Sequence, residues 1–272
     1  MAIIRNLTLS DWSQFQILEL DTFENDPLDK ETFTRNLEYD GFFGLYIDEK
    51  VLIGYLYCRI YGDYAHLHRT GVLSSERGKG YGSQLFEKAI SYFEEHNLPQ
   101  FNLFVETHNE PAIRLYRKYS LKIIFESWHF IINLEEHATY AKTIFSEVTS
   151  KELGFDDLPL VQKTFSQANL IELRGMLEDM KNQPTGNKFI EMFQGPKLLA
   201  VARFNKKFSG CRPFFITDIG YFDTFISKLI ELKPPEKEYI RITFDDNDAV
   251  ADLCLKRNYT VHHHLYKMTR QV

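Results

Sequence analysis

The chain has only three cysteines among its 272 residues, Cys58, Cys211 and Cys254, and they lie far apart. An odd number without any C-x-x-C pair argues against a disulfide framework. No apolar run approaches the roughly 20 residues that a membrane-spanning helix needs. The amino terminus contains Asp11 and lacks the apolar stretch of a signal peptide. These absences predict a soluble cytoplasmic protein that has no membrane partner.

A positive charge excess is also missing, because 32 Lys and Arg stand against 38 Asp and Glu, a net charge of −6. Such a balance disfavours nucleic acid and anionic membranes as partners, and it mildly favours cationic ones such as amines. Hydrophobic residues make up 44% of the chain, and its 23 Phe and 15 Tyr allow a sizeable core. The composition is therefore that of a folded globular protein.

Hydrophobic spacing predicts alternating strands and helices in the first half of the chain. Apolar runs that predict strands occur at 42–47, 52–60 and 101–105. Five apolar residues beyond a glycine-rich segment fall on one stripe of a helix: Leu85, Phe86, Ala89, Ile90 and Phe93. Residues 121–125 and 128–133 predict two separate closing strands. The order of elements is typical of a mixed α/β (α+β) fold.

The second half of the chain repeats this plan after about 140 residues. Three pairs of segments match in the same order: 7–23 with 148–165, 45–60 with 192–204, and 104–124 with 243–263. Three matches in one order favour a duplicated domain over chance similarity. We therefore expect two domains, residues 1–139 and residues 140–272.

The glycine-rich segment 77–83 lies between a predicted strand and a predicted helix. Glycines let several backbone N–H groups turn inward, and the helix that follows adds its unpaired N–H donors and the positive end of its dipole. Arg77 and Lys79 add positive charge. The segment fits neither G-x-x-x-x-G-K-[ST] nor G-x-G-x-x-G. It predicts a pyrophosphate site of another kind.

Two motifs give this chain a resemblance to the GNAT superfamily of acyl-CoA-dependent N-acyltransferases. The first is R-x-x-G-x-G, formed by Arg77, Gly80 and Gly82. The second is N-x-x-A-x-x-L-Y, formed about 30 residues later by Asn109, Ala112, Leu115 and Tyr116. The family usually ends the second helix with Gly-Phe, whereas this chain has Ser120-Leu121. That departure affects the end of the helix rather than the chemistry.

The resemblance implies two tandem GNAT-like domains, each with a mixed, mostly antiparallel sheet flanked by helices. The first is expected to be the catalytic domain, and the second a degenerate copy without the cofactor loop. Acetyl-CoA is the implied cosubstrate, and no metal is expected. Tyr116 is expected to protonate the departing thiolate as a general acid. The residues expected at the cofactor are Val72, Leu73, Arg77, Gly78, Lys79, Gly80, Tyr81, Gly82, Ser83, Asn109 and Tyr116.

The general base is not fixed by the resemblance, because Phe104 stands where some relatives carry a Glu. Glu106 is close by, and we expect it either to point to the other face of its strand or to lie where that strand ends. His66 and His68 alternate on the strand that leads to Val72, so both can face the acceptor groove. We name Glu106 and His68 as catalytic candidates, and His66, Glu24 and Asp26 as candidates for acceptor binding.

The acceptor is expected to be a primary amine, a small molecule by slight preference, or else a peptide N-terminus or lysine. A non-catalytic acyl-CoA-binding module is the alternative function, and it would not need Tyr116. The run His262–His264 is not read as a metal site, because consecutive strand residues point to opposite faces. We expect a monomer or a homodimer.

Overall fold

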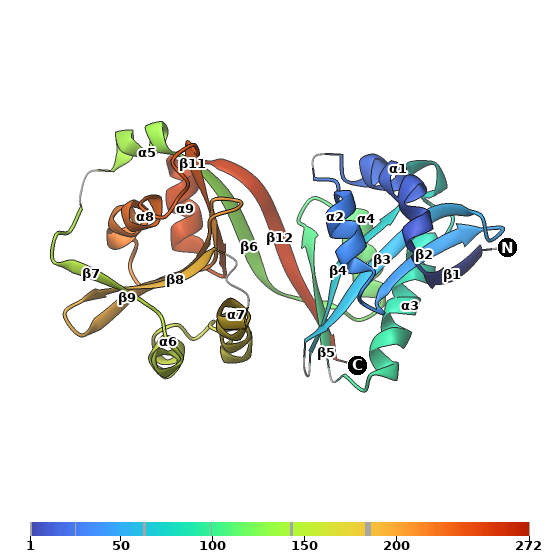
Figure 1. Cartoon of the computed structure of the whole chain (residues 1–272), viewed down its shortest axis with the longest axis horizontal. Helices are drawn as coiled ribbons and strands as arrows, with labels where there is room; N and C mark the ends of the chain where they lie inside the picture. The colour runs from blue at the N-terminus through green and yellow to red at the C-terminus, as the bar shows by residue number, and fades with distance from the viewer. Residues whose placement is uncertain are drawn as a thin grey trace. The chain divides into compact units, whose positions relative to one another are not determined.

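The computed structural model describes residues 2–24, 26–61, 64–98, 100–141, 144–182 and 186–271. It divides into two compact units, one formed by Met1–Ile124 with Tyr266–Val272 and the other by Phe125–Leu265. Figure 1 draws most of the first unit in blue to green and the second in green to red. The elements of each unit follow from the sequence that forms it.

The first unit is a mixed sheet covered by helices on both faces. Its strands are β1 (Ala2–Asn6), β2 (Phe42–Ile47), β3 (Val51–Tyr61), β4 (Tyr64–Val72) and β5 (Gln100–Glu106). Its helices are α1 (Trp12–Thr22), α2 (Lys30–Asn36), α3 (Tyr81–Glu95) and α4 (Glu110–Lys118). The strand order is β1-β2-β3-β4-β5, and only β4 and β5 run parallel within it. Beside β5 lies the last part of β12 (Thr260–Gln271).

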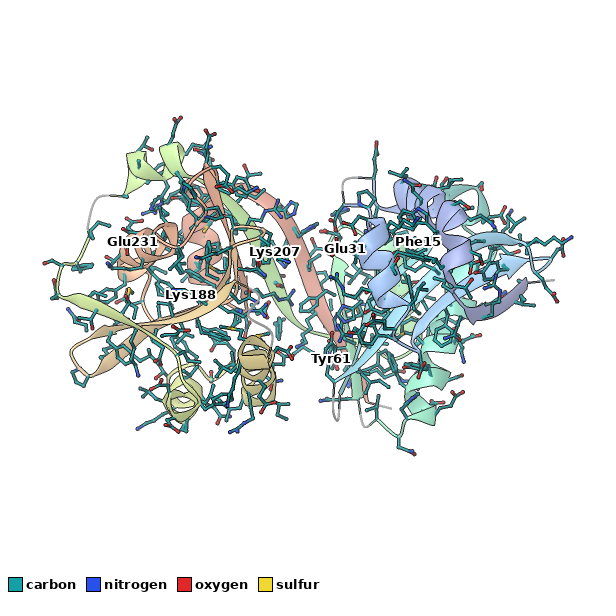
Figure 2. All side chains as sticks on the ribbon, in the orientation of Figure 1. Phe15, Glu31, Tyr61, Lys188, Lys207 and Glu231 are labelled. Carbon is teal, nitrogen blue, oxygen red and sulfur yellow. The ribbon has the colours of Figure 1, made fainter. Side chains whose placement is uncertain are left out.

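Each face of this sheet has its own apolar core. The helix predicted from the stripe 85–93 is confirmed as α3, and all five of those residues are buried against the sheet. On the other face, Phe15 of α1 packs against Phe33, Phe42 and Tyr55 with ring centroids 4.6 to 5.5 Å apart (Figure 2). Such aromatic pairs contribute about 0.5–1.5 kcal/mol each beyond their buried area. They hold α1 and α2 on the sheet.

The second unit repeats the same order of strands and helices. Its strands are β6 (Lys122–Asn133), β7 (Val148–Glu152), β8 (Asn187–Gln194), β9 (Lys197–Asn205), β10 (Gly210–Ile216) and β11 (Tyr239–Asp245). Its helices are α5 (Leu134–Tyr140), α6 (Leu158–Thr164), α7 (Leu170–Asn182), α8 (Phe222–Ile230) and α9 (Asp248–Lys256). The strand order is β6-β11-β10-β9-β8-β7, with β10 and β11 parallel. The predicted fold class, a mixed and mostly antiparallel sheet with flanking helices in each half, is confirmed.

Matching local contacts support the duplication. Asn109 caps α4 by accepting a hydrogen bond from the N–H of Ala112 at 3.2 Å, and Asn247 caps α9 through the N–H of Val250 at 3.1 Å. Ser120 and Asn258, which follow these two helices, both adopt left-handed backbone angles, with φ of 67° and 55°. The same capping residue and the same left-handed backbone at matching helix positions indicate one ancestral pattern.

The two predicted closing strands are one continuous strand, so that prediction was wrong. Residues 125–133 of β6 belong to the second unit, where Ser127–Asn133 pair with β11. The first unit is instead completed by Tyr266 and the residues after it, with Met268 fully buried in its core. Each half of the sequence thus ends in a strand that passes into the other unit. The spacing of apolar residues cannot reveal this exchange. It indicates that β6 and β12 are strands, but not which unit each part of them joins. The division of roles between residues 1–139 and 140–272 stays a prediction.

Candidate active site

The central feature of the first unit is an opening between β4 and β5. The two strands pair only where Ala65–Leu67 meets Phe101–Leu103. Beyond that point β4 continues to Val72, bonded on its other side to β3. Leu73 donates its N–H to the carbonyl of Ile53 on β3, so the alternation of a strand directs the N–H and C=O of Val72 toward the opening. A strand edge with exposed backbone groups can pair with an extended ligand.

A glycine-rich loop follows this edge directly. Gly78 and Gly80 have φ of 78° and 87°, a backbone conformation that other residues adopt with strain. A Cβ atom at either position would meet nothing within 4 Å, so the loop leaves open space above it. Gly80 then caps the 15-residue helix α3, whose first N–H groups have no partner within the helix. The loop has the form of an anion cradle at a helix N-terminus.

The glycine loop carries two basic side chains, and two carboxylates lie beside it. Arg77 and Lys79 are exposed, and Lys79 lies 2.9 Å from Glu76. The Arg77 side chain donates from Nε to the carbonyl of Val72 at 3.1 Å, which links the loop to the open strand edge. The sequence analysis missed Asp21 of α1, which anchors the start of the loop. Its carboxylate accepts from the Ser74 hydroxyl at 2.7 Å and from the Ser74 N–H, and these bonds lower the pKa of Asp21.

Tyr116 lies on α4 and is buried in the apolar core between α3, α4 and the sheet, with 5% of its surface exposed. Its ring packs against Phe86 at a centroid distance of 5.1 Å. Burial raises the pKa of Tyr116 above its ordinary value, so the hydroxyl stays protonated at neutral pH. A protonated hydroxyl is the state that a proton donor needs. Asn109 is committed to capping α4 through its Oδ1, which leaves only its Nδ2 for any ligand.

The predicted acceptor residues lie on the α1–α2 face. Asn102, Phe104 and Glu106 of β5 share one half-buried face, and Glu106 is the last residue of the strand. Of the two placements expected for Glu106, the strand end is confirmed and the opposite face is not. His66 hydrogen-bonds through Nδ1 to Oδ1 of Asn102 at 2.5 Å, so it is held against β5. His68 bonds through Nε2 to the Tyr61 hydroxyl at 2.8 Å.

The two acidic candidates differ in their surroundings. Glu24 is exposed, whereas the carboxylate of Asp26 lies 3.2 Å from Nη1 of Arg69. The second group beside Arg69 is Glu19, a fully buried residue of α1 that the sequence analysis missed. Glu19 accepts from the Tyr55 hydroxyl and from the N–H of Leu28 at 2.7 Å. Its helix position was the available signal, because Glu19 falls four residues after the buried Phe15.

The equivalent loop of the second unit is shorter and contains a carboxylate. Only residues 217–221 separate β10 from α8, whereas residues 73–80 separate β4 from α3. Asp218 lies in this shorter loop, where its carboxylate accepts from the N–H of Gly220 at 2.8 Å. A carboxylate at this point repels phosphate. Cys254, seven residues after the capping Asn247, stands where Tyr116 stands after Asn109.

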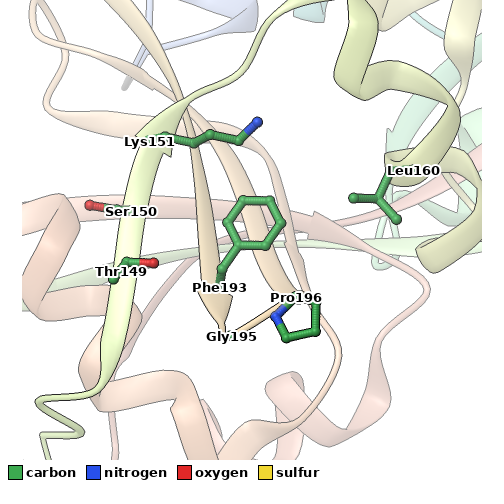
Figure 3. A pocket seen from close by; sticks show the side chains of 7 residues that line it. All are labelled: Thr149, Ser150, Lys151, Leu160, Phe193, Gly195 and Pro196. Carbon is green, nitrogen blue, oxygen red and sulfur yellow. The ribbon is translucent and has the colours of Figure 1, made fainter.

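The second unit has a shallow pocket of about 310 Å³, which is poorly suited to bind a charged ligand. Figure 3 shows it between β7 and the β8–β9 turn, lined by Lys151, Phe193, Pro196 and neighbouring residues. The Lys151 ammonium is already paired with Asp157 at 2.6 Å and with Glu191 at 3.3 Å. This pocket therefore has no free charge with which to fix a ligand.

Within the ranges that the structure describes, no group of three or more His, Cys, Asp or Glu is placed to hold a metal ion. His262–His264 lie on β12, where His264 hydrogen-bonds to Glu126 at 2.7 Å. No helix in those same ranges combines the length and the apolarity that a bilayer crossing requires.

Comparison with known proteins agrees with this geometry. Residues 4–120 match the family described as the acetyltransferase (GNAT) family. A Bacillus subtilis (strain 168) protein named as a ribosomal protein bS18 alanine N-acetyltransferase is 28% identical over 123 residues, which cover 44% of this chain and 81% of that protein.

Two solved structures share the fold of almost the whole chain. A GCN5-related N-acetyltransferase from Sphaerobacter thermophilus has a TM-score of 0.74 at 12% identity, covering 99% of this chain and 95% of that one. A protein from Pyrococcus horikoshii named as an acetyltransferase has a TM-score of 0.68 at 14% identity, covering 100% of this chain and 89% of that one. At these identities the likeness extends to the fold alone.

Proposed function

We propose that this chain, whose residues 4–120 match the acetyltransferase (GNAT) family, binds acetyl-CoA in its first unit and transfers the acetyl group to a primary amine. The observation that carries this proposal is the continuity between the open edge of β4 at Val72 and the glycine loop 77–83. One strand edge and one anion cradle in succession suit a ligand with an extended amide arm and a pyrophosphate.

In this proposal, the glycine loop binds the pyrophosphate of acetyl-CoA and the end of β4 binds its amide arm. The N–H groups at the start of α3, with Arg77 and Lys79, hold the pyrophosphate. The backbone N–H of Val72 pairs with the amide arm and positions the thioester, and Leu73 holds this point of β4 against β3. Gly78, Gly80 and Gly82 keep the space above the loop clear, since side chains there would fill it. Acetyl-CoA supplies an activated acetyl thioester.

The proposed reaction is a direct attack. The amine nitrogen forms a bond to the acetyl carbon, the carbon–sulfur bond breaks, and its electron pair leaves with the sulfur. Tyr116 gives a proton to this thiolate, whose thiol has a pKa of about 8.5 by analogy with cysteine. The amine loses one proton to a base. The products are an N-acetyl amide and free CoA thiol.

Glu106 is the better placed of the two candidates for that base. Glu106 is four residues beyond Asn102 on β5, as Thr70 is four residues beyond its partner His66 on β4, so both lie past the point where the two strands part. Thr70 is two residues from Val72, whereas His68 is four residues away. Glu106 also shares the acceptor face with Phe104. We therefore assign Glu106 as the base and His68 as a wall of the acceptor site.

The identity of the acceptor is left at the level of a primary amine. The Bacillus subtilis relative is named for an N-terminal alanine of a ribosomal protein. Its match covers only the first unit, so either a peptide N-terminus or a small amine suits the proposal. A cytoplasmic location and a monomeric or homodimeric state stay predictions, as does the second unit's role as a non-catalytic copy.

Titration calorimetry with acetyl-CoA tests the proposal directly. We expect one site per chain, and release of CoA thiol when a panel of primary amines is added. Two sites per chain would mean that the second unit also binds the cofactor. Binding without any turnover would favour an acyl-CoA-binding module, and an absence of binding would refute the proposal.

A further inference from the structure

A cavity of about 330 Å³ opens on the acceptor face of the first unit, between α2 and the strands β3 and β4. It is distinct from the glycine loop, which follows the end of β4. Three arginines and a histidine contribute to its wall, together with two tyrosines: Arg35, Tyr39, Tyr57, Arg59, His68 and Arg69. Among the described residues no Asp or Glu lines it. The wall is therefore strongly basic in a protein whose net charge is −6.

The three arginines are not equivalent. Arg69 is neutralised by Glu19 and Asp26, each at 3.2 Å. Neither Arg35 nor Arg59 makes an ion pair with a carboxylate in the part of the chain that the structure describes. The charge of Arg35 is the last-ranked of the influences on the pKa of the exposed Asp29, so the coupling between these two groups is weak. Two guanidinium groups at this cavity thus lack a counter-ion among the described residues.

Arg59 carries a further unsatisfied group. Its guanidinium lies over the rings of Tyr39 at 4.1 Å and Tyr61 at 4.8 Å, which fixes its plane. Its Nε is buried and has no hydrogen-bond partner. A buried donor without a partner costs free energy, so the hydrogen-bonding capacity of the Arg59 guanidinium is not fully used within the protein. Burial also raises the pKa of Tyr57, which keeps that hydroxyl available as a donor.

We propose that this cavity binds an anionic group of the acceptor, a carboxylate or a phosphate, through Arg35 and Arg59. A planar guanidinium matches either oxyanion with two parallel hydrogen bonds. This inference rests on the proposed function, because the acceptor amine must reach the thioester at Val72. It adds a substrate class, namely amines that carry a negative charge at a distance from the reacting nitrogen.

That distance follows from the strand. His68 and Arg69, at the cavity, precede Val72 by four and three residues on β4. At about 3.3 Å per residue the separation is roughly 10–13 Å. An extended peptide of three or four residues spans it, with its amino group at Val72 and its carboxylate at the cavity. A single amino acid is too short to reach both ends.

Titration calorimetry of the CoA-saturated full chain tests the inference with two probes that differ in one group. The probes are tetra-alanine as the free acid and tetra-alanine with a carboxy-terminal amide, in buffer of physiological ionic strength. The free acid is expected to bind at least 10-fold more tightly, although the net charge of the protein favours the more cationic amide. Di-alanine acid should lose most of this preference. A peptide amide ending in phosphoserine distinguishes phosphate from carboxylate as the preferred anion.

Variants locate the effect. Arg59→Gln and, separately, the exposed Arg35→Gln should each reduce the preference for the acid at least 5-fold, and Arg59→Lys should retain part of it. Arg114→Gln on α4, which removes an exposed arginine outside the cavity, should leave it unchanged. Unchanged acetyl-CoA affinity shows that the variants are folded.

The outcomes separate this inference from the proposed function. Equal affinity for acid and amide, no binding of either at millimolar concentration, or a preference that survives both arginine variants would overturn the inference while acetyl-CoA binding stood. Failure of acetyl-CoA to bind would overturn the proposed function. The same peptide pair titrated into CoA-free protein would still report on the cavity.

Discussion

The guanidinium of Arg69 lies 3.2 Å from the carboxylate of Glu19, a side chain with no exposed surface. This pair joins β4 to α1 on the face of the first sheet that α1 and α2 cover, where the predicted acceptor residues lie. Glu19 also accepts the N–H of Leu28, so it fixes the segment that leads from α1 to α2. The proposed acceptor site is therefore built on a buried ion pair whose partners are both hydrogen-bonded.

Glu19→Gln tests the importance of this pair. Removing the carboxylate leaves Arg69 with only the exposed Asp26 as a counter-charge, and breaking a buried ion pair by removing one partner costs about 3–5 kcal/mol. We expect a lower free energy of unfolding by roughly that amount and a raised KM for the amine, with acetyl-CoA affinity nearly unchanged. Chemical denaturation and steady-state kinetics measure these. Glu31→Gln on the exposed face of α2 is the control, and an equally mild effect of both would contradict the prediction.

Tyr116→Phe tests the proton donor. Loss of the hydroxyl should lower kcat by about 10²-fold or more, while acetyl-CoA affinity stays the same. In the parent protein the raised pKa of Tyr116 predicts no loss of its proton near pH 10, where an ordinary tyrosine ionises. Rate profiles from pH 6 to 10.5 check both points. An unchanged kcat in the variant would remove Tyr116 from the mechanism.

Gly82→Glu tests the phosphate cradle. A Cβ at Gly82 meets its nearest neighbour, Cδ2 of Leu115, at an ordinary 3.6 Å, so the substitution fits the fold. The added carboxylate at the start of α3 opposes a bound pyrophosphate, and acetyl-CoA affinity should fall at least 10-fold. Gly175→Glu on α7, also in open space, is the matched control. Calorimetry that found equal affinities in the two variants would place the cofactor elsewhere.

Met268→Ala tests the exchange of terminal strands. Met268 is fully buried in the core of the first unit, so truncation should cost about 2–4 kcal/mol of that unit's stability. Val261→Ala, at a position of the same strand that is 41% exposed, should cost well under half of that. Hydrogen exchange of β5 amides reports the first unit specifically. No change in their protection would show that the end of the chain does not stabilise this unit.

Glu191→Gln tests a buried carboxyl of the second unit. Burial, followed by the charge of Asp157, raises the pKa of Glu191 from 4.5 to about 7, although Lys151 opposes this. Between these pH values the unfolded chain ionises first, so the parent loses stability as pH rises through this range. The variant has no such loss, and should be more stable at pH 8 by about 2 kcal/mol, with little difference at pH 4.5.

Thermal unfolding at the two pH values measures this effect. The exposed Glu152→Gln on β7 is the control, because its carboxylate stays hydrated in both states. A stability gain of equal size at pH 4.5 and pH 8 would show that ionisation of Glu191 is not its cause.

Periodicity and motif were sufficient for much of this protein. The stripe from Leu85 to Phe93 forms α3, because a helix that covers a sheet must bury one side whatever its neighbours are. The glycines of the loop 77–83 adopt the backbone that their lack of a Cβ permits. Asn109 and Asn247 cap their helices through contacts only three residues long. All of these features depend on residues that are close together in the sequence, so the sequence alone is enough to predict them.

Only the tertiary structure decided the remaining features. The pairing of Arg69 with Glu19 joins residues 50 positions apart, and burial of Met268 joins the end of the chain to the first unit. The basic cavity collects Arg35 from a helix and Arg59 from a strand. Alternation specifies which face a strand residue occupies, but the partner across that face depends on strand order and register. Strand order and register are set by the packing of the whole chain. The sequence therefore predicts the cofactor loop, whereas only the fold brings together the residues of the proposed acceptor site.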